Sequence, residues 1–202
     1  MRLRLARVNT AAYGATMERK KERLNAEIWL LAGFRALAEK GPSGLKAEAI
    51  ARDLKTTKGS FYWHFKDIPD FKARMLAFWE ERALEGVVEA IDSIDGAEAR
   101  LRRLVDIASE DGPEHGGAAA EPAIRDWMRY DKDVQAVVQR VDAQRLAYLA
   151  SRFVDADIND PALPRVFYAS LIGLEVLSIS DGQPVRASLH HLLDVFLRAE
   201  NP

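Results

Sequence analysis

A short run of residues after Thr57 has the chemistry to contact a phosphate backbone. Thr57 can accept a backbone hydrogen bond as a helix cap, and a lysine, a glycine and a serine follow at positions 58 to 60. In the first turn of a helix, these residue types let phosphates or base edges approach free backbone N–H groups. The segment therefore indicates binding to nucleic acid.

Two short helices joined by a polar turn are predicted to position this run. Phe61 and Phe65 lie four residues apart and can anchor the second helix, which leaves Tyr62 outward. Apolar residues at positions i, i+4, i+5 and i+9 share one face of the first helix: Leu45, Ala49, Ile50 and Leu54. This is the layout of a helix-turn-helix, whose second helix enters a major groove of DNA. The alternative is an ordinary helical hairpin on a soluble protein.

The segment from residue 28 to 71 has a distinctive set of residues: Ile28, Ala32, Phe34, Gly41, Ile50, Ala51, Gly59, Ser60, Phe61, Tyr62, His64 and Phe65. With these residues it resembles the N-terminal domain of TetR-family transcriptional regulators. It implies a three-helix DNA-binding domain attached to a larger all-helical domain, which dimerises and usually holds a small-molecule effector. The motif and the resemblance together give these candidate DNA contacts: Lys46, Thr57, Lys58, Gly59, Ser60, Tyr62, Trp63, His64 and Lys66.

The chain departs from the family pattern in two places. Lys55 and Thr56 stand where the turn usually has a glycine followed by an apolar residue. Ile68 replaces a lysine that is common after the motif, which removes a phosphate contact. Lys66 could supply that contact instead.

Charge is divided unevenly along the chain. Residues 1–66 contain 14 Lys and Arg against 6 Asp and Glu, a balance of +8, whereas residues 67–202 contain 15 against 25, a balance of −10. A basic N-terminal part on an acidic body favours contact with DNA through the N-terminal part alone. The alternative is a basic segment that only improves solubility.

Composition excludes several other classes of protein. A chain of 202 residues with 48% hydrophobic content can bury a core, and the absence of cysteine excludes disulfides and thiolate metal sites. No run approaches the ~20 apolar residues that a membrane-spanning helix needs. We therefore expect a cytoplasmic protein that does not bind a membrane.

The fold is predicted to be all-α, with about nine helices. We expect residues 1–17 to be a disordered basic arm, residues 18–66 to be the DNA-binding domain, and residues 67–202 to be an effector-binding and dimerisation domain. Asp67 can cap a long helix that runs from residue 69 to 94 and joins the two domains. Later helices are expected at about residues 97–110, 122–130, 132–154, 166–179 and 185–196.

The segment from Val166 to Ile179 is apolar on every face, and Glu175 is its only charged residue. Fourteen residues are too few to span a membrane, and a surface helix would have one apolar stripe. We therefore expect a homodimer, in which this helix and the last one meet their two-fold mates. The alternative is the central helix of a monomer. The predicted interface residues are Val166, Ser170, Gly173, Leu174, Leu177, Leu189, Leu192 and Phe196.

The body also contains more large aromatic and thioether side chains than its packing obviously requires, and such side chains can hold an unidentified small-molecule effector. The candidates are Trp79, Trp127, Met128, Tyr130, Tyr148, Phe167 and Tyr168, each of which could instead be core. Three residues, Arg125, Arg129 and His115, could select a polar group, with solvated surface as the default reading.

Catalysis is not expected. His190 and His191 are adjacent and so point in different directions on a helix. Phosphate-cradling loops and nucleophile elbows are missing from the sequence, and we expect no metal or cofactor. The sequence therefore predicts a repressor that binds a pseudo-palindromic DNA operator as a dimer and is released by an effector. The alternative is a helical adaptor that binds another protein without sequence-specific DNA binding.

Overall fold

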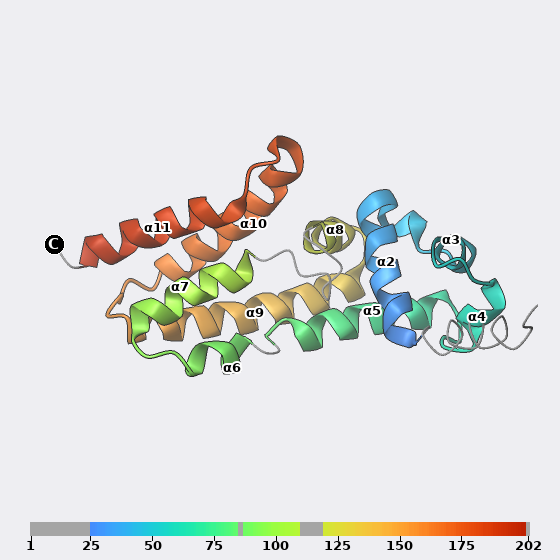
Figure 1. Cartoon of the computed structure of the whole chain (residues 1–202), viewed down its shortest axis with the longest axis horizontal. Helices are drawn as coiled ribbons and strands as arrows, with labels where there is room; N and C mark the ends of the chain where they lie inside the picture. Colours follow the sequence, from blue (N-terminus) through green and yellow to red (C-terminus); the bar gives the residue numbers. More distant parts are fainter. Residues whose placement is uncertain (1–24, 85–86, 110–118, 201–202) are drawn as a thin grey trace, which may run out of the picture.

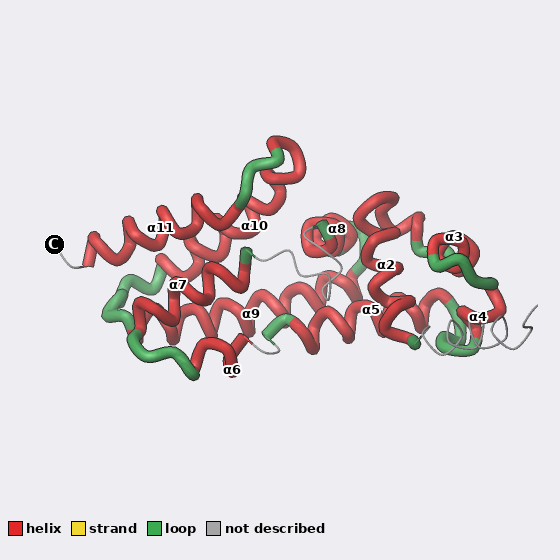
Figure 2. Tube along the Cα trace, in the orientation of Figure 1, coloured by secondary structure: helices red, strands yellow, loops and turns green. Residues whose placement is uncertain are grey.

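The computed structural model describes residues 25–84, 87–109 and 119–200. Within these ranges every regular element is a helix, and the molecule is elongated, with the N-terminal helices at one end and the C-terminal helix at the other (Figures 1 and 2). The prediction of an all-α fold is confirmed. The expected arm at residues 1–17 and the candidate His115 lie outside the described ranges.

The N-terminal part, which we call the head, contains α2 (Ala26–Lys40), a short 3₁₀-helix (Gly41–Gly44), α3 (Ala47–Asp53) and α4 (Lys58–Tyr62). The Asn25 side chain caps α2 by accepting a hydrogen bond from the Ile28 backbone N–H at 3.0 Å. Gly41 ends the helix with a φ of 63°, a conformation that glycine adopts without strain. Local sequence signals therefore determine both ends of α2.

The turn between α3 and α4 contains a lysine whose backbone has the left-handed helical conformation. Lys55 has a φ of 53°, and the Thr56 backbone N–H donates to the Ala51 carbonyl at 2.8 Å to close the turn. This is the position where the family pattern has a glycine, so the departure noted in the sequence places a residue with a Cβ where it is strained. The helix-turn-helix geometry is retained despite this strain.

Helix α5 (Ile68–Arg82) begins where the sequence predicted, because the Asp67 side chain accepts from the Asp70 backbone N–H at 2.8 Å. It crosses α2 at Gly33, where an added Cβ would lie 2.6 Å from Cζ of Phe71 and 2.7 Å from Sδ of Met75. A side chain at position 33 would push the two helices apart. The glycine therefore allows the head to pack directly on the first helix of the body.

The prediction of one long helix from residue 69 to 94 is wrong. Helix α5 ends at Arg82, and a separate helix, α6 (Val87–Asp92), follows and packs against α7 (Ala97–Ala108). The expectation followed helical apolar spacing on both sides of Gly86, although a glycine inside a helix costs about 1 kcal/mol. No continuous helix connects the head with the far end of the body.

The remaining helices are α8 (Ala120–Trp127), α9 (Lys132–Asp155), α10 (Leu163–Asp181) and α11 (Val185–Glu200). Buried side chains form two clusters, and α9 contributes its first half to one and its second half to the other. The first core joins the head to α5, α8 and the first half of α9, and includes Trp29, Phe61, Trp127 and Val141. The second core joins α7, the second half of α9, α10 and α11. Helix α9 is therefore the element that connects the two cores (Figure 1).

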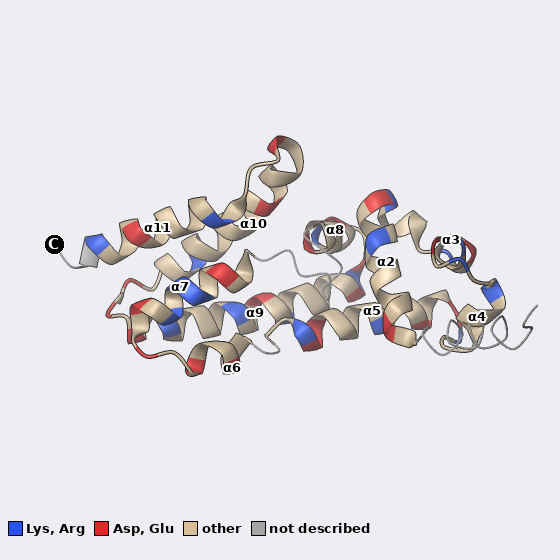
Figure 3. Cartoon of the chain, viewed as in Figure 1, with Lys and Arg blue, Asp and Glu red and all other residues tan. Residues whose placement is uncertain are grey.

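Helix α10 is longer than expected, with 19 residues from Leu163 to Asp181. Pro164 is accommodated in its first turn, and Gly182, with a φ of 66°, ends it. Its mean hydropathy of 1.3 satisfies a length-and-composition test for a membrane span, and only 17% of that window is buried in the chain. The core helix of a soluble protein can satisfy the same test. Few charged residues interrupt the helix (Figure 3), so it presents an apolar surface that the chain itself does not cover.

Candidate nucleic-acid interface and internal cavity

Helix α4 is fixed from behind by aromatic packing. Phe61 is fully buried and contacts the edges of Trp29 and Phe71, with ring centroids 5.5 and 5.2 Å apart. At the start of the helix, the Thr57 side chain accepts from the Ser60 backbone N–H at 3.3 Å, as the sequence predicted. One face of α4 is thus locked to the head, and the opposite face points outward.

The outward face carries most of the predicted DNA contacts. Trp63 is 88% exposed and Tyr62 is 49% exposed, which is unusual for large aromatic side chains. The other exposed candidates are Lys46, Thr57, Lys58, Gly59 and Lys66, whereas Ser60 and His64 are half-buried. His64 packs toward Trp29, with centroids 6.4 Å apart. The candidates therefore gather around one exposed helix at the far end of the head (Figure 1).

Gly59 is not required by the fold. A Cβ added there would meet only Oγ1 of Thr57, at 3.6 Å, which is an ordinary van der Waals distance. Alanine would also suit a helix better by about 1 kcal/mol. The absence of a side chain at this position leaves the α4 backbone open to close approach by another molecule.

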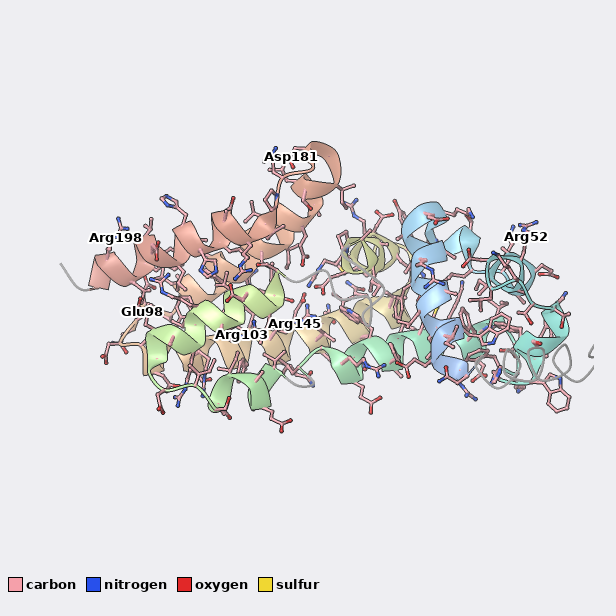
Figure 4. The ribbon with its side chains drawn as sticks, in the orientation of Figure 1. Arg52, Glu98, Arg103, Arg145, Asp181 and Arg198 are labelled. Carbon is pink, nitrogen blue, oxygen red and sulfur yellow. The ribbon has the colours of Figure 1, made fainter. Side chains whose placement is uncertain are left out.

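An ion pair links α4 to α3. The Lys58 ammonium binds the Glu48 carboxylate and lies 5.9 Å from the centre of the Tyr62 ring. The hydrogen bond from Lys58 lowers the pKa of Glu48, and the same bond raises the pKa of Lys58. Both groups are exposed, so a phosphate can compete for this lysine. A further exposed cation, Arg52, projects outward from α3 (Figure 4) and was not among the sequence candidates.

The body contains a cavity of about 200 Å³. Its walls come from α5, α7, α8, α9, α10 and the start of α6. Four of the predicted ligand-binding residues line it: Trp79, Tyr148, Phe167 and Tyr168. The structure thus brings together aromatic side chains that are up to 89 positions apart in the sequence.

The other three predicted ligand-binding residues lie elsewhere. Trp127 is part of the first core, where its Nε1 donates to Asp131 at 3.2 Å. Met128 packs against the same core, and Tyr130 is 80% exposed. None of the three lines the cavity.

A cluster of ion pairs includes three residues that line the cavity, Glu121, Arg145 and Tyr168. Nη1 of Arg145 binds both carboxylate oxygens of Glu121, at 2.7 and 2.8 Å, and Nη2 of Arg125 binds one of them at 2.7 Å. Arg125 also binds Asp142, at 2.7 and 3.2 Å, and the Tyr168 hydroxyl donates to Asp142 at 2.8 Å. We call these five residues the ion cluster. Figure 4 shows Arg145 in the middle of the molecule.

Burial and charge act in opposite directions on the ion cluster. Burial alone would raise the pKa of Glu121, but Arg145 and Arg125 outweigh it and hold this pKa below its ordinary value. Burial also raises the pKa of Tyr168 to about 12. Glu121 is therefore ionised and Tyr168 protonated at neutral pH.

Sequence reasoning missed Glu121 and Asp142, and treated Arg125 as solvated surface by default. That default is wrong, because the Arg125 side chain is only 11% exposed. Arg129, at 70% exposure, does lie at the surface. The spacing of Glu121 and Arg125 by four residues on one helix was the available signal, but their partners on α9 and α10 are set by tertiary packing.

One residue that lines the cavity, Tyr148, has an unsatisfied polar atom. The Tyr148 hydroxyl is buried and has no hydrogen-bond partner among the described residues. Buried hydroxyls normally have a partner, so this one is an exception that needs an explanation. Burial raises the pKa of Tyr148, which keeps the hydroxyl protonated at neutral pH.

The predicted dimer residues divide into two groups. Val166, Gly173 and Leu177 are exposed, and a Cβ at Gly173 would meet nothing within 4 Å in the described part of the chain. The half-buried members are Ser170, Leu174 and Leu192, and the buried ones are Leu189 and Phe196, which belong to the second core. Additional exposed apolar residues on α10 and α11 are Val176, Ile179 and Val195.

Among the described residues, no group of three or more His, Cys, Asp or Glu side chains could hold a metal ion. The two sites that the structure does present are the outward face of α4 and the cavity in the body. Together with the all-helical fold, they are typical of a helix-turn-helix DNA-binding protein whose head packs directly on a larger helical body.

Comparison with known proteins identifies the head. Residues 30–70 match the family model described as bacterial regulatory proteins, tetR family. No curated protein matches the chain by sequence. The match places residues 30–70, which contain the helix-turn-helix, in this family.

Solved structures share the fold over most of the chain. A protein from Rhodococcus sp., described as a TetR-family transcriptional regulator, is 24% identical with a TM-score of 0.67 and covers 85% of this chain and 97% of its own. A TetR-family regulator from Streptomyces coelicolor is 16% identical with a TM-score of 0.71, over 93% and 96%. A transcriptional regulator from Saccharomonospora viridis, solved in complex with choline, is 16% identical with a TM-score of 0.72, over 86% and 95%.

Proposed function

We propose that the chain is a dimeric, cytoplasmic repressor that binds a pseudo-palindromic operator and leaves it when a small molecule occupies the body cavity. The observation that carries the DNA-binding part is the outward face of α4. There a glycine that the fold does not need lies beside an exposed lysine and two exposed aromatic side chains. Such a face suits insertion into a major groove, with the α4 backbone close to DNA.

The exposed surface of α10 supports a homodimer. Val166, Val176, Leu177 and Ile179 are each about half exposed or more on this helix, and α11 adds Val195. Contiguous apolar surface of this kind is typical of an interface, and a two-fold axis would let each copy cover the other. A dimer would also hold two reading helices at a fixed separation, about one helical turn of DNA or a multiple of it.

The ion cluster supports a route from the cavity to the head. Helix α8 packs against α2 in the head and carries Glu121 into the cavity wall, where it binds Arg145 of α9. A ligand that favours one arrangement of these side chains would shift the position of α8 and hence of the head. The break after Arg82 makes this route more direct than a tilt of one long helix.

The small-molecule part of the proposal has support from one structure of similar fold. The regulator from Saccharomonospora viridis was solved in complex with choline. A body of this fold can therefore accompany a small ligand, and the cavity lined by Trp79 and Tyr168 is the candidate site in this chain.

The DNA-binding proposal is tested by titrating the full chain into a labelled fragment of the intergenic DNA next to its gene, at two salt concentrations. We expect selective binding that weakens as salt rises. Lys58→Ala should weaken binding and reduce the salt slope by about 1, while Lys132→Ala, an exposed lysine on α9, should leave both unchanged. A strictly monomeric protein, or one with no preference for any duplex over bulk competitor, would contradict the proposal and favour the adaptor reading.

A further inference from the structure

An exposed carboxylate lies beside the outward face of α4. Glu48, in the first turn of α3, binds the ammonium of Lys58, the first residue of α4, and its side chain is 63% exposed. Lys58 in turn lies 5.9 Å from the centre of the Tyr62 ring, which belongs to that face. A negative charge is therefore present on the surface proposed to approach DNA, although the sequence did not suggest Glu48 as a DNA contact.

The fold does not depend on this ion pair. Exposed ion pairs add little to stability, because water screens them and holding two long side chains in one geometry costs entropy. Helix α4 is fixed to the head instead by Phe61, which is fully buried against Trp29 and Phe71. Helix α3 is fixed by Ile50, which is also buried. The pair between Glu48 and Lys58 can therefore open without disturbing the head.

Binding to DNA would open the pair. The Lys58 side chain is half exposed, so a phosphate can compete with Glu48 for its ammonium. The Glu48 carboxylate is ionised at neutral pH, because the hydrogen bond from Lys58 and the charge of Lys46 hold its pKa below the ordinary value of 4.5. An ionised carboxylate can only accept hydrogen bonds. Once Lys58 has moved to a phosphate, Glu48 therefore needs a hydrogen-bond donor on the DNA.

The base edges differ in the donors that they offer to such a group. In the major groove cytosine N4 and adenine N6 donate hydrogen bonds, whereas guanine N7 and O6 and thymine O4 only accept them. Adenine also has its N7 acceptor beside N6, and this atom would repel the second oxygen of a carboxylate. Cytosine has no such acceptor, so it is the base that suits a carboxylate best.

We infer that Glu48 selects a cytosine in each half of the operator, with its carboxylate accepting a hydrogen bond from the N4 amino group while Lys58 binds a phosphate. This inference rests on the proposed binding of α4 in a major groove. Where the base is not a donor, the carboxylate would face acceptors and repel them, which lowers affinity for the wrong sequence.

The inference is tested by selecting duplexes from a random library with the full chain and with Glu48→Ala. We expect the parent to select a C·G pair at one position of each half-site, and the variant to lose the preference at that position alone. Anisotropy titrations on the selected duplex should show about a 5- to 150-fold loss of affinity for the variant. Duplexes of unrelated sequence should bind the variant equally or more tightly, because it has lost a negative charge.

Two further variants separate base selection from charge and folding. Glu48→Gln should shift the preference at the same position toward adenine, because a glutamine amide can bind N6 and N7 of adenine together. The matched control is Glu39→Ala, which removes the same charge from an exposed pair with Lys40 at the end of α2 and should leave every base preference unchanged. Melting temperatures check that all three variants fold as the parent does.

Three results would overturn the inference. They are unchanged base preferences in Glu48→Ala, an equal loss of its affinity for selected and unrelated duplexes, and a change of preference confined to an A·T pair. A parent that selects no sequence refutes the proposed function. A selective parent whose preferences Glu48→Ala leaves unchanged refutes only the role of Glu48.

Discussion

Replacing Glu121 by glutamine tests whether the ion cluster holds the body together. The Glu121 side chain is 16% exposed and receives three hydrogen bonds of 2.7 to 2.8 Å from Arg145 and Arg125. Glutamine has nearly the same shape but no charge. Glu121→Gln therefore removes the carboxylate and leaves both guanidinium groups in place.

The expected loss of stability depends on which partners Arg125 and Arg145 retain in the variant. Removing one partner of a buried ion pair costs about 3–5 kcal/mol. Arg125 retains Asp142 and the Tyr168 hydroxyl, but Arg145 loses its only carboxylate in the described structure. We therefore expect the lower end of the range, about 3 kcal/mol, which lowers Tm by roughly 6–12 °C for a chain of this length.

Thermal and urea denaturation, followed by circular dichroism, measure this loss. The control is Glu98→Gln, which removes the same charge from an exposed pair with Arg102 on α7 and should cost less than about 1 kcal/mol. Equal losses in the two variants, or a loss below about 1 kcal/mol for Glu121→Gln, would refute the reasoning.

The same variant has a predicted pH dependence. The folded-state pKa of Glu121 lies below its ordinary value of 4.5, so its contribution to stability is present above pH 4.5 and is lost as the pH falls through the folded pKa. Glu121→Gln should therefore show a shallower loss of stability below pH 4.5 than the parent. Parallel acid unfolding curves would contradict the ionised state assigned to this residue.

Three other substitutions test separate parts of the fold. Lys55→Gly should stabilise the protein by about 0.5–1 kcal/mol by relieving the left-handed backbone at φ 53°, and an unchanged urea midpoint would contradict the strain. Gly33→Ala should destabilise the protein by about 1–2 kcal/mol, because the new Cβ would overlap Phe71 and Met75 and the cost of this overlap exceeds the gain in helix propensity. A rise in Tm would refute this packing. Leu177→Asp should shift the proposed dimer toward monomer in analytical ultracentrifugation without loss of helix content. A persistent dimer would show that Leu177 lies outside the interface.

Features set by neighbouring residues were predictable from the sequence. The caps at Thr57 and Asp67 are confirmed because each depends on a hydrogen bond to a residue three positions later. Phe61 is buried as predicted, since its spacing from Phe65 places both on one face of the α4 region. The same local rules failed after Arg82, where α5 ends although the apolar spacing of the sequence continues.

Features set by distant residues were only partly predictable. Large aromatic side chains suggested a cavity, but composition could not separate Tyr148, in the wall, from Tyr130, at the surface. The partners of Glu121 lie on its own helix and 24 residues later on α9, and nothing local distinguishes this carboxylate from an exposed one. The predicted DNA contacts, ligand contacts and dimer residues stay predictions that binding experiments must test.

The first core passes without interruption from Trp29 in the head to Trp127 in α8 and Val141 in α9. In a chimera that joins residues 1–66 to the body of another regulator, this shared core would be divided between two proteins. The apolar surface of α2 that packs on α8 would then face a foreign helix. Transplanting the operator preference of this protein should therefore require changing only surface residues of α3 and α4, or moving α8 together with the head.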